Sequence, residues 1–213
     1  MCDSTTVKRI GILGGSFDPI HLGHLLIAEI ARDTLHLDQV RFMLAAISPL
    51  KQDRPPTSDQ GRLEMLQLAV AGNPAFQVDD RELRRGGVSY TVDSLRELHV
   101  EIPDAELFFL MGADSLVEFH RWKEPEAICQ LSKVIVLLRG GQPKPDIVLL
   151  ERYLGHAATE QDELFLTLPQ LEISSSDIRQ RVESGRSIRY QVPACVEAYI
   201  QAHSLYSKSK QAK

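Results

Sequence analysis

Uninterrupted apolar runs alternate along the chain with stretches in which apolar residues recur at helical spacing. A short apolar run bounded by turn residues is typical of a buried strand in a parallel sheet. We predict strands at 9–13, 40–45, 76–78, 107–111, 134–138 and, with a weaker pattern, 164–168. We predict helices at 22–35, 58–71, 92–99, 115–119 and 125–131. Because strands and helices alternate, the pattern predicts an α/β fold whose parallel strands are joined by right-handed crossovers.

No internal repeat or long linker divides the sequence, so we expect a single domain over residues 1–213. The turn-rich segment 140–145 is expected to border a C-terminal helical part at about 170–205, and the polar tail 207–213 is expected to fray. The predicted class is a Rossmann-like, doubly wound parallel sheet with a small C-terminal helical subdomain. Ligands of such sheets bind beyond the carboxyl ends of the strands, near a topological switch point.

The first predicted strand leads into the string GGSFDPIHLGH at residues 14–24, which has the features of a phosphate site. Gly14 and Gly15 carry no Cβ, so a phosphate group can approach their backbone closely. His21 and His24 open the following helix three positions apart, and their side chains therefore fall on one face of its first turn. The N–H groups and positive dipole end of a helix N-terminus favour an anion. Both imidazoles can donate hydrogen bonds to phosphate oxygens as negative charge develops there.

The same string also has simpler interpretations. Two histidines three apart can form a metal-binding pair or lie on the surface, although no third ligand with the usual spacing follows them. Ser16 and Phe17 continue the glycine turn, and Phe17 fits a packing role better than a chemical one. The complete string is far more specific than its parts, so we favour the phosphate site.

A second helix start near the C-terminus has the same character. Ser174, Ser175 and Ser176 precede a helical pattern, and Arg179 falls in its first turn. Serines in this position can cap the helix and leave N–H groups facing a ligand, while the arginine can reach phosphate oxygens. An ordinary capped helix with an exposed arginine is the alternative. Because the histidine string is also an anion site at a helix start, we favour an anion site here as well.

Other polar positions follow predicted strands or begin predicted helices. Lys51, after the second strand, can neutralise a phosphate or can be a solvated loop lysine. Thr91 can offer its hydroxyl and nearby N–H groups to a carboxylate or phosphate, or can simply cap a helix. Gly112 permits close approach of a ligand, and Asp114 can accept hydrogen bonds from ribose hydroxyls, cap the helix that follows, or do both.

Three charged residues have structural interpretations. Arg62, which begins the apolar part of a predicted helix, either supports the loop before it through a buried ion pair or is exposed. Arg81 and Glu82 are interpreted as scaffold charges.

Composition and charge exclude several classes of function. A hydrophobic fraction of 43% and a charged fraction of 25% are typical of a globular soluble protein. The net charge of −5 argues against a broad surface for nucleic-acid phosphates, whereas a nucleotide-sized anion needs only a local positive site. No apolar run approaches the roughly 20 residues of a membrane helix, and no secretory signal pattern is present, so we expect a cytoplasmic protein. The scattered cysteines at 2, 129 and 195 are expected to be free thiols.

The string GGSFDPIHLGH matches the GxFDPxHxGH signature of nucleotidyltransferases. MGADS, RW, LLR and ISSSDIR follow it in the order seen in bacterial nicotinate-nucleotide adenylyltransferases. This resemblance extends over about residues 8–200. It implies adenylyl transfer from ATP to nicotinate mononucleotide, by in-line attack of the substrate phosphate without a covalent enzyme intermediate. The products would be pyrophosphate and nicotinate adenine dinucleotide for NAD synthesis, and Mg²⁺ would arrive with the nucleotide.

The resemblance also implies roles for individual residues. Charge stabilisation in the transition state falls to His21, His24 and Arg179. Contacts to ATP are expected from Gly14, Gly15, Ser16, Phe17, His21, His24, Gly112, Asp114, Ser174, Ser175, Ser176 and Arg179. Contacts to nicotinate mononucleotide are expected from Lys51, Tyr90, Thr91, Trp122, Lys123 and Arg139. The Trp122 ring would stack on the pyridine, and no residue is expected to ligate a metal held by the protein.

The chain departs from the family pattern at Leu50, Lys123 and Gly140, where the family often has histidine, tyrosine and proline. The alternatives are another adenylyl- or cytidylyltransferase of the same fold, for example one that uses phosphopantetheine, and a non-catalytic nucleotide-binding regulator. Small molecules are the expected partners, rather than nucleic acid or a membrane, and homo-oligomerisation is left open.

Overall fold

Six strands form one parallel sheet in the part of the chain that the structure, a computed structural model, describes: residues 7–49, 57–140, 144–146, 148–154 and 164–207. The strands are β1 (Arg9–Gly15), β2 (Gln39–Leu44), β3 (Phe76–Asp79), β4 (Glu106–Gly112), β5 (Lys133–Arg139) and β6 (Phe165–Leu168). Their order across the sheet is β3-β2-β1-β4-β5-β6, and every neighbouring pair is parallel. All the strand predictions are confirmed, with bounds that agree within two residues.

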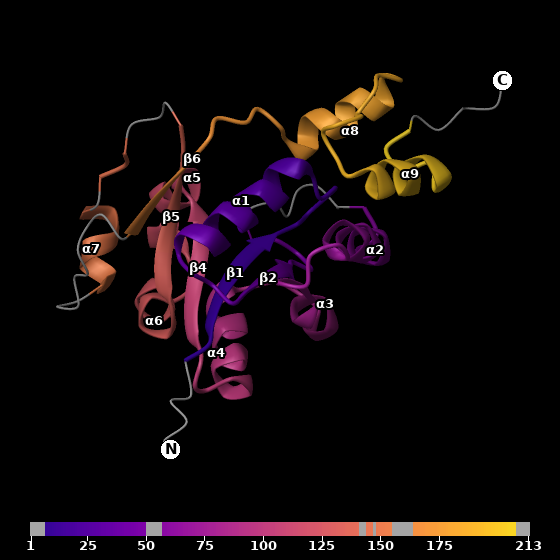
Figure 1. Ribbon diagram of the computed structural model, residues 1–213. Helices are drawn as coiled ribbons and strands as arrows, with labels where there is room; N and C mark the ends of the chain where they lie inside the picture. Colours follow the sequence, from indigo (N-terminus) through magenta and orange to yellow (C-terminus); the bar gives the residue numbers. More distant parts are fainter. Residues whose placement is uncertain (1–6, 50–56, 141–143, 147, 155–163, 208–213) are drawn as a thin grey trace, which may run out of the picture.

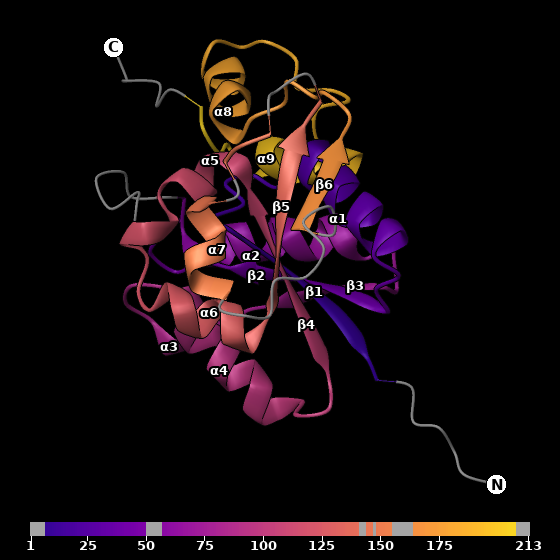
Figure 2. The same ribbon diagram turned by 90° about the vertical axis from the view of Figure 1, so that its left-hand side faces the viewer.

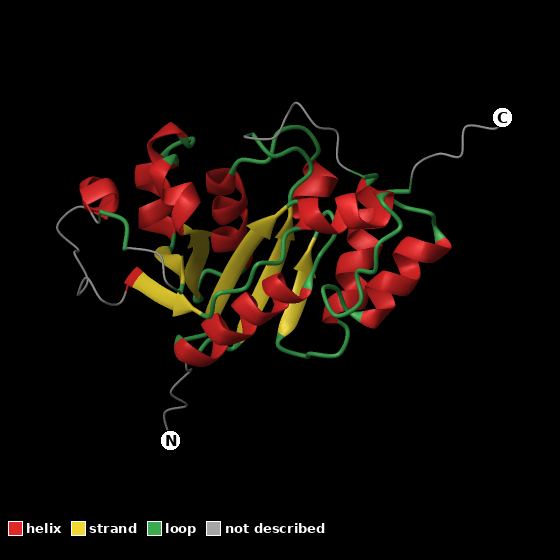
Figure 3. Ribbon diagram, turned by 90° about the horizontal axis from the view of Figure 1, so that it is seen from above, coloured by secondary structure: helices red, strands yellow, loops and turns green. Residues whose placement is uncertain are grey.

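Helices cover both faces of the sheet (Figure 3). Those on one face are α1 (Leu22–Thr34), α2 (Asp59–Val70), α8 (Ser175–Glu183) and α9 (Ala194–Ala202). Those on the other face are α4 (Thr91–Glu101), α5 (Ala113–Val117), α6 (Pro125–Leu131) and α7 (Val148–Leu154). Each group packs on its own apolar cluster, and Leu13 of β1 belongs to the first while its neighbour Ile12 belongs to the second. Side chains that alternate along a strand therefore supply both halves of the core.

The apolar pattern does not predict α3 (Arg81–Arg85) or α7. α3 has five residues and four of them are charged, so it shows no apolar repeat, and α7 follows the turn-rich segment. The helix predicted at 115–119 divides into α5 and a 3₁₀ turn at Phe119–Arg121. Of the described helices, none is long and apolar enough to cross a membrane.

The strand order reverses between β1 and β4, which are neighbours in the centre of the sheet. In a doubly wound sheet this reversal leaves a crevice at the carboxyl ends of the two strands. The strands point toward the end of the sheet where α8 lies (Figure 2). Figure 1 shows α8 and α9 near each other and α8 close to the start of α1. α8 and α9 form the predicted C-terminal helical part, which lies next to the crevice.

Arg62 of α2 is fully buried, and each of the five N–H donors of its guanidinium has an acceptor. The bonds run from Nε to Thr57 O (3.2 Å), from Nη1 to Ser16 O (2.9 Å) and Ala45 O (2.8 Å), and from Nη2 to Ala46 O (3.3 Å) and Asp59 Oδ1 (2.5 Å). One side chain thereby joins the turn after β1, the end of β2 and the start of α2. Of the two interpretations of the sequence, the exposed arginine is wrong. Arg62 is buried and forms an ion pair that supports the loop, although its partner Asp59 is 56% exposed.

Arg81 and Glu82 are buried, as expected of scaffold charges. Arg81 binds the carboxylates of Asp79 (2.8 Å) and Glu101 (2.7 Å). Glu82 accepts a hydrogen bond from Ser94 Oγ (2.6 Å), which joins α3 to α4. Burial nevertheless raises the pKa of the Glu82 carboxyl, because removing water disfavours its charged form more than the hydrogen bond favours it.

The substitution Arg62→Met tests the buried guanidinium. It leaves four backbone carbonyls without their donor, and each unsatisfied buried polar group costs about 1–3 kcal/mol. We expect the free energy of unfolding, measured by urea denaturation, to fall by about 3 kcal/mol or more. Arg84→Met is the matched control, because Arg84 forms an exposed ion pair with Asp80 worth under about 1 kcal/mol. Equal losses in the two variants would contradict the role given to Arg62.

The substitution Glu82→Gln tests the buried carboxyl, because it removes the charge and keeps an oxygen acceptor. A raised pKa in the folded state means that native stability is complete below the ordinary carboxyl pKa and falls as the pH rises through the raised value. The glutamine variant lacks this fall. We therefore expect its free energy of unfolding to gain on that of the native chain as the pH rises above the ordinary carboxyl pKa of about 4, as measured by urea denaturation. A difference that stays constant with pH would show that burial does not perturb Glu82.

Candidate active site

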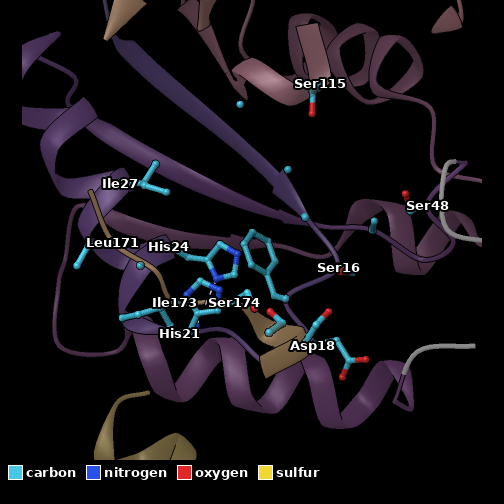
Figure 4. Close-up of a pocket in the computed structure, with 18 of the residues that line it drawn as sticks. Ser16, Asp18, His21, His24, Ile27, Ser48, Ser115, Leu171, Ile173 and Ser174 are labelled. Carbon is cyan, nitrogen blue, oxygen red and sulfur yellow. Dashed lines mark hydrogen bonds between the residues drawn. The ribbon is translucent and has the colours of Figure 1, made fainter. Parts of the chain in front are cut away.

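A cavity of about 1250 Å³ opens at the carboxyl ends of β1 and β4. Every residue assigned above to ATP lines it, namely Gly14, Gly15, Ser16, Phe17, His21, His24, Gly112, Asp114, Ser174, Ser175, Ser176 and Arg179. Figure 4 shows His21, His24 and Ser174 together, with Ser48 and Ser115 apart from that group. The fold thus brings together segments from β1, α1, β4 and α8 that the sequence separates.

The turn after β1 is shaped around the ring of Phe17, which is 1% exposed and has a φ of +42°. The ring lies edge-on to His24 at a centroid distance of 5.1 Å and tilted against Phe42 at 5.7 Å. A Cβ at Gly15 would lie 3.0 Å from this buried ring, which explains the glycine. The N–H of Ala45 donates to Gly15 O (2.9 Å), so the turn is also paired with the end of β2. The packing role predicted for Phe17 is confirmed.

The two histidines lie against each other at the start of α1. His21 is the N-cap and His24 the third helical residue, and their rings stack with centroids 3.6 Å apart. The backbone N–H of His21 donates to His24 Nδ1 (3.3 Å), so in the neutral imidazole of His24 the hydrogen is on Nε2. A Cβ at Gly23 would lie 3.0 Å from His21 Nδ1, so the glycine between the histidines leaves room for that ring. The common face predicted for the pair is confirmed.

α8 begins at the wall of the cavity. Ser174 is its N-cap and accepts a hydrogen bond from the N–H of Asp177 (3.1 Å), which confirms the predicted serine cap. Ser175 Oγ donates to Pro19 O (2.9 Å) in the turn that precedes α1. The N-terminal ends of two helices therefore border one cavity, and each end favours an anion.

Arg179 is bound to that same turn. Its Nη1 donates to the backbone carbonyl of Asp18 (2.6 Å), and its Nη2 donates to Ser176 Oγ (3.3 Å). The residue is half-buried, so the alternative of an exposed arginine is wrong. The guanidinium thus brings a positive charge to the wall that the two helix ends form.

Gly112 and Asp114 border the cavity from the end of β4. Asp114 is the second residue of α5, and the N-cap is Gly112, which has no side chain to cap the helix. The N-cap interpretation of Asp114 is therefore wrong, while a contact to ribose stays a prediction. Within the described ranges, no group of three or more His, Cys, Asp or Glu side chains is arranged to hold a metal ion.

The described side chains assigned to nicotinate mononucleotide are Tyr90, Thr91, Trp122 and Lys123, and none of them lines this cavity. Tyr90 is the N-cap of α4, so Thr91, the first helical residue, does not cap the helix. Trp122 is half-buried and packs on Phe109 and Phe119, with centroid distances of 5.9 Å and 5.5 Å. Stacking of Trp122 on a pyridine stays a prediction.

Lys123 is already paired within the chain. Its Nζ lies 2.9 Å from Asp93 Oδ2 and 4.9 Å from the centre of the Tyr90 ring. A carboxylate on a bound pyridine would have to compete with Asp93 for this ammonium group.

Four positions named in the sequence analysis lie outside the described residues or next to them. Leu50 and Lys51 are outside the described residues, and so is the side chain of Arg139, whose backbone ends β5. Gly140 donates its N–H to Leu168 O (2.8 Å), and a Cβ there would lie 3.1 Å from that oxygen. A proline has no N–H to donate, so the proline that the family often has at this position could not form this bond to the end of β6.

Sequence reasoning missed Asp18, Thr57 and Tyr206, which also line the cavity. The acidic residue inside GGSFDPIHLGH is a signal that could have singled out Asp18. Tyr206 precedes the polar tail and belongs to no pattern, so only the fold reveals it.

Comparisons with known proteins identify the family to which the chain belongs. The cytidylyltransferase-like family model matches residues 12–181. The protein named "Probable nicotinate-nucleotide adenylyltransferase" in Rhodopirellula baltica is 46% identical over 198 residues, which cover 92% of each chain. The protein of the same name in Thermus thermophilus is 46% identical, over 93% of this chain and 99% of its own.

Solved structures extend the comparison to the fold. The nicotinic acid mononucleotide adenylyltransferase of Plasmodium falciparum, complexed with NaAD, superposes with a TM-score of 0.74 at 20% identity, over 93% of this chain and 97% of that one. At this identity the likeness establishes the fold alone. From the family model and the curated relatives, the chain belongs to the cytidylyltransferase-like family and, within it, to the nicotinate-nucleotide adenylyltransferases.

Proposed function

We propose that this enzyme transfers the adenylyl group of ATP to nicotinate mononucleotide, giving nicotinate adenine dinucleotide and pyrophosphate in NAD biosynthesis. The observation that carries the proposal is the meeting of two helix N-terminal ends, the stacked histidines and Arg179 in one cavity. The family membership supplies the two substrates. Both are metabolites, and we place the reaction in the cytoplasm.

The chemistry needs no nucleophile from the protein. An oxygen of the substrate 5′-phosphate forms a bond to the α-phosphorus of ATP, and the bond to the bridging oxygen breaks, so that its electron pair leaves with pyrophosphate. Catalysis of such a step consists of positioning and charge stabilisation. Mg²⁺ is proposed to enter with the triphosphate, with phosphate and water oxygens as its main ligands.

The proposed roles follow from position. His24 would donate from Nε2 to a phosphate oxygen, with His21 beside it, as negative charge develops. Arg179 and the start of α8 would hold the β- and γ-phosphates. Asp114 would accept ribose hydroxyls at the end of β4.

The second substrate would lie toward the start of α4. The segment before α4 is tied to the end of β2, because Ser89 Oγ accepts from Ala46 N–H (2.9 Å) and Ser89 N–H donates to Ile47 O (2.9 Å). Ala46 and Ile47 also line the ATP cavity, so the two binding regions adjoin there. The residues proposed for nicotinate mononucleotide are Lys51, Tyr90, Thr91, Trp122, Lys123 and Arg139.

The test of the proposal is pyrophosphate release by the purified chain with ATP and Mg²⁺. We expect rapid release with nicotinate mononucleotide and little with nicotinamide mononucleotide or phosphopantetheine. Release with another acceptor alone would keep the chemistry and overturn the assigned substrate. Binding of ATP without release in any mixture would instead indicate a non-catalytic regulator.

The substitution His24→Ala tests the proposed donor. Removing one such donor from a developing oxyanion costs about a hundredfold to a thousandfold in turnover, and we expect a kcat loss of that size with an unchanged circular dichroism spectrum. His120→Ala is the control, because His120 is exposed and does not line the cavity. Near-normal turnover of the His24 variant would rule out its role in the reaction.

A further inference from the structure

Asp18 is a buried carboxylate in the turn between β1 and α1, at 7% exposure. Its Oδ1 accepts a hydrogen bond from the Tyr206 hydroxyl (2.7 Å), and its Oδ2 accepts one from the N–H of Thr57 (3.2 Å). Its backbone carbonyl accepts the bond from Arg179. Three distant segments of the chain therefore bind one residue of the turn that carries the histidines.

Tyr206 follows α9 and is the C-terminal partner in this arrangement. It lines the ATP cavity and also an adjoining hollow of about 520 Å³, and Arg179 lines both as well. Burial, together with the nearby Asp18 carboxylate, raises the pKa of the Tyr206 phenol, so the hydroxyl stays a donor at physiological pH.

The hydrogen bond has an electrostatic consequence for a polyanionic ligand. A buried carboxylate in the wall of a triphosphate site repels the phosphates, and donors that bind it reduce that repulsion. Among the described residues, this carboxylate accepts two hydrogen bonds, and Tyr206 supplies the only one that comes from a side chain. Loss of the Tyr206 hydroxyl would leave more negative charge on Asp18 facing the nucleotide. It would also loosen the turn that leads to His21 and that contains the Asp18 carbonyl bound by Arg179.

We propose that Tyr206 is a positioning residue for adenylyl transfer, acting through Asp18 on the ATP side of the site. The inference rests on the proposed function. It assigns to the segment after α9 a part in catalysis that nothing in the motifs indicates. The proposal also predicts that loss of Tyr206 affects ATP and not nicotinate mononucleotide. Asp18 and Tyr206 line the ATP cavity, whereas the described residues proposed for nicotinate mononucleotide do not.

The chain offers a matched pair of variants. Tyr206→Phe and Tyr199→Phe each remove one hydroxyl that donates to a carboxylate, at 2.7 Å to Asp18 and at 2.6 Å to Glu64. Only the first of these hydroxyls belongs to a residue that lines the cavity. We expect Tyr206→Phe to lower kcat/KM for ATP by about tenfold, the effect of one hydrogen bond to a charged group. KM for nicotinate mononucleotide should not change, and Tyr199→Phe should change neither parameter.

A double-mutant cycle tests whether Tyr206 acts through Asp18. If it does, Tyr206→Phe added to Asp18→Asn should cost far less than Tyr206→Phe alone, because the carboxylate it serves is already gone. Additive losses would overturn the proposal, and so would equal losses in Tyr206→Phe and Tyr199→Phe or a matching rise in KM for nicotinate mononucleotide.

Calorimetric binding of a non-hydrolysable ATP analogue keeps this test separate from the proposed reaction. Weaker binding by Tyr206→Phe than by Tyr199→Phe supports the inference even if another acceptor proves to be the substrate. Equal binding by both variants, together with unchanged kinetics, would overturn it.

Discussion

A buried charged side chain needs an acceptor for each of its N–H donors. Arg62 has four acceptors on backbone carbonyls and a fifth on the Asp59 carboxylate. Its guanidinium bonds to carbonyls of the turn after β1 and of the end of β2, so two neighbouring strands end at a fixed distance. The shape of the turn after β1 depends on this, because Arg62 binds Ser16 O directly beside the buried Phe17 ring around which the turn folds. Desolvating the charge is costly, and only the full set of acceptors offsets it. Ser16 and Ala45, whose carbonyls Arg62 binds, both line the cavity, so Arg62 holds two parts of the cavity wall together.

In the proposed site, a net acidic chain binds a triphosphate through a positive potential that is local. The groups proposed to supply it are the N-terminal ends of α1 and α8, whose N–H groups add no net charge, and Arg179 of α8, which binds the turn before α1. Other arginines are engaged elsewhere in ion pairs, such as Arg81 with Asp79 and Glu101. The field at the cavity therefore comes from the placement of a few groups rather than from composition.

The strands and the turn after β1 could be predicted because their signals are local. Five successive apolar residues identify a central strand such as β4, and the string around His21 and His24 holds within a few positions most of the residues that form the turn and the start of α1. Arg62 was undecided because its acceptors come from three segments that only the fold assembles. α3 was missed because four of its five residues are charged, which leaves no apolar period, and only Arg81 and Glu82 of these are buried. Tyr206 was missed because its partner lies 188 positions away.

The bond between Arg179 and Asp18 spans 161 positions of the chain. Ribosomes synthesise a chain from its N-terminus, so β1 and α1 are made before α8 exists. A growing chain therefore contains both histidines before Arg179 is made. The wall that joins the starts of α1 and α8 forms only after α8 has been synthesised and has packed against the turn that precedes α1.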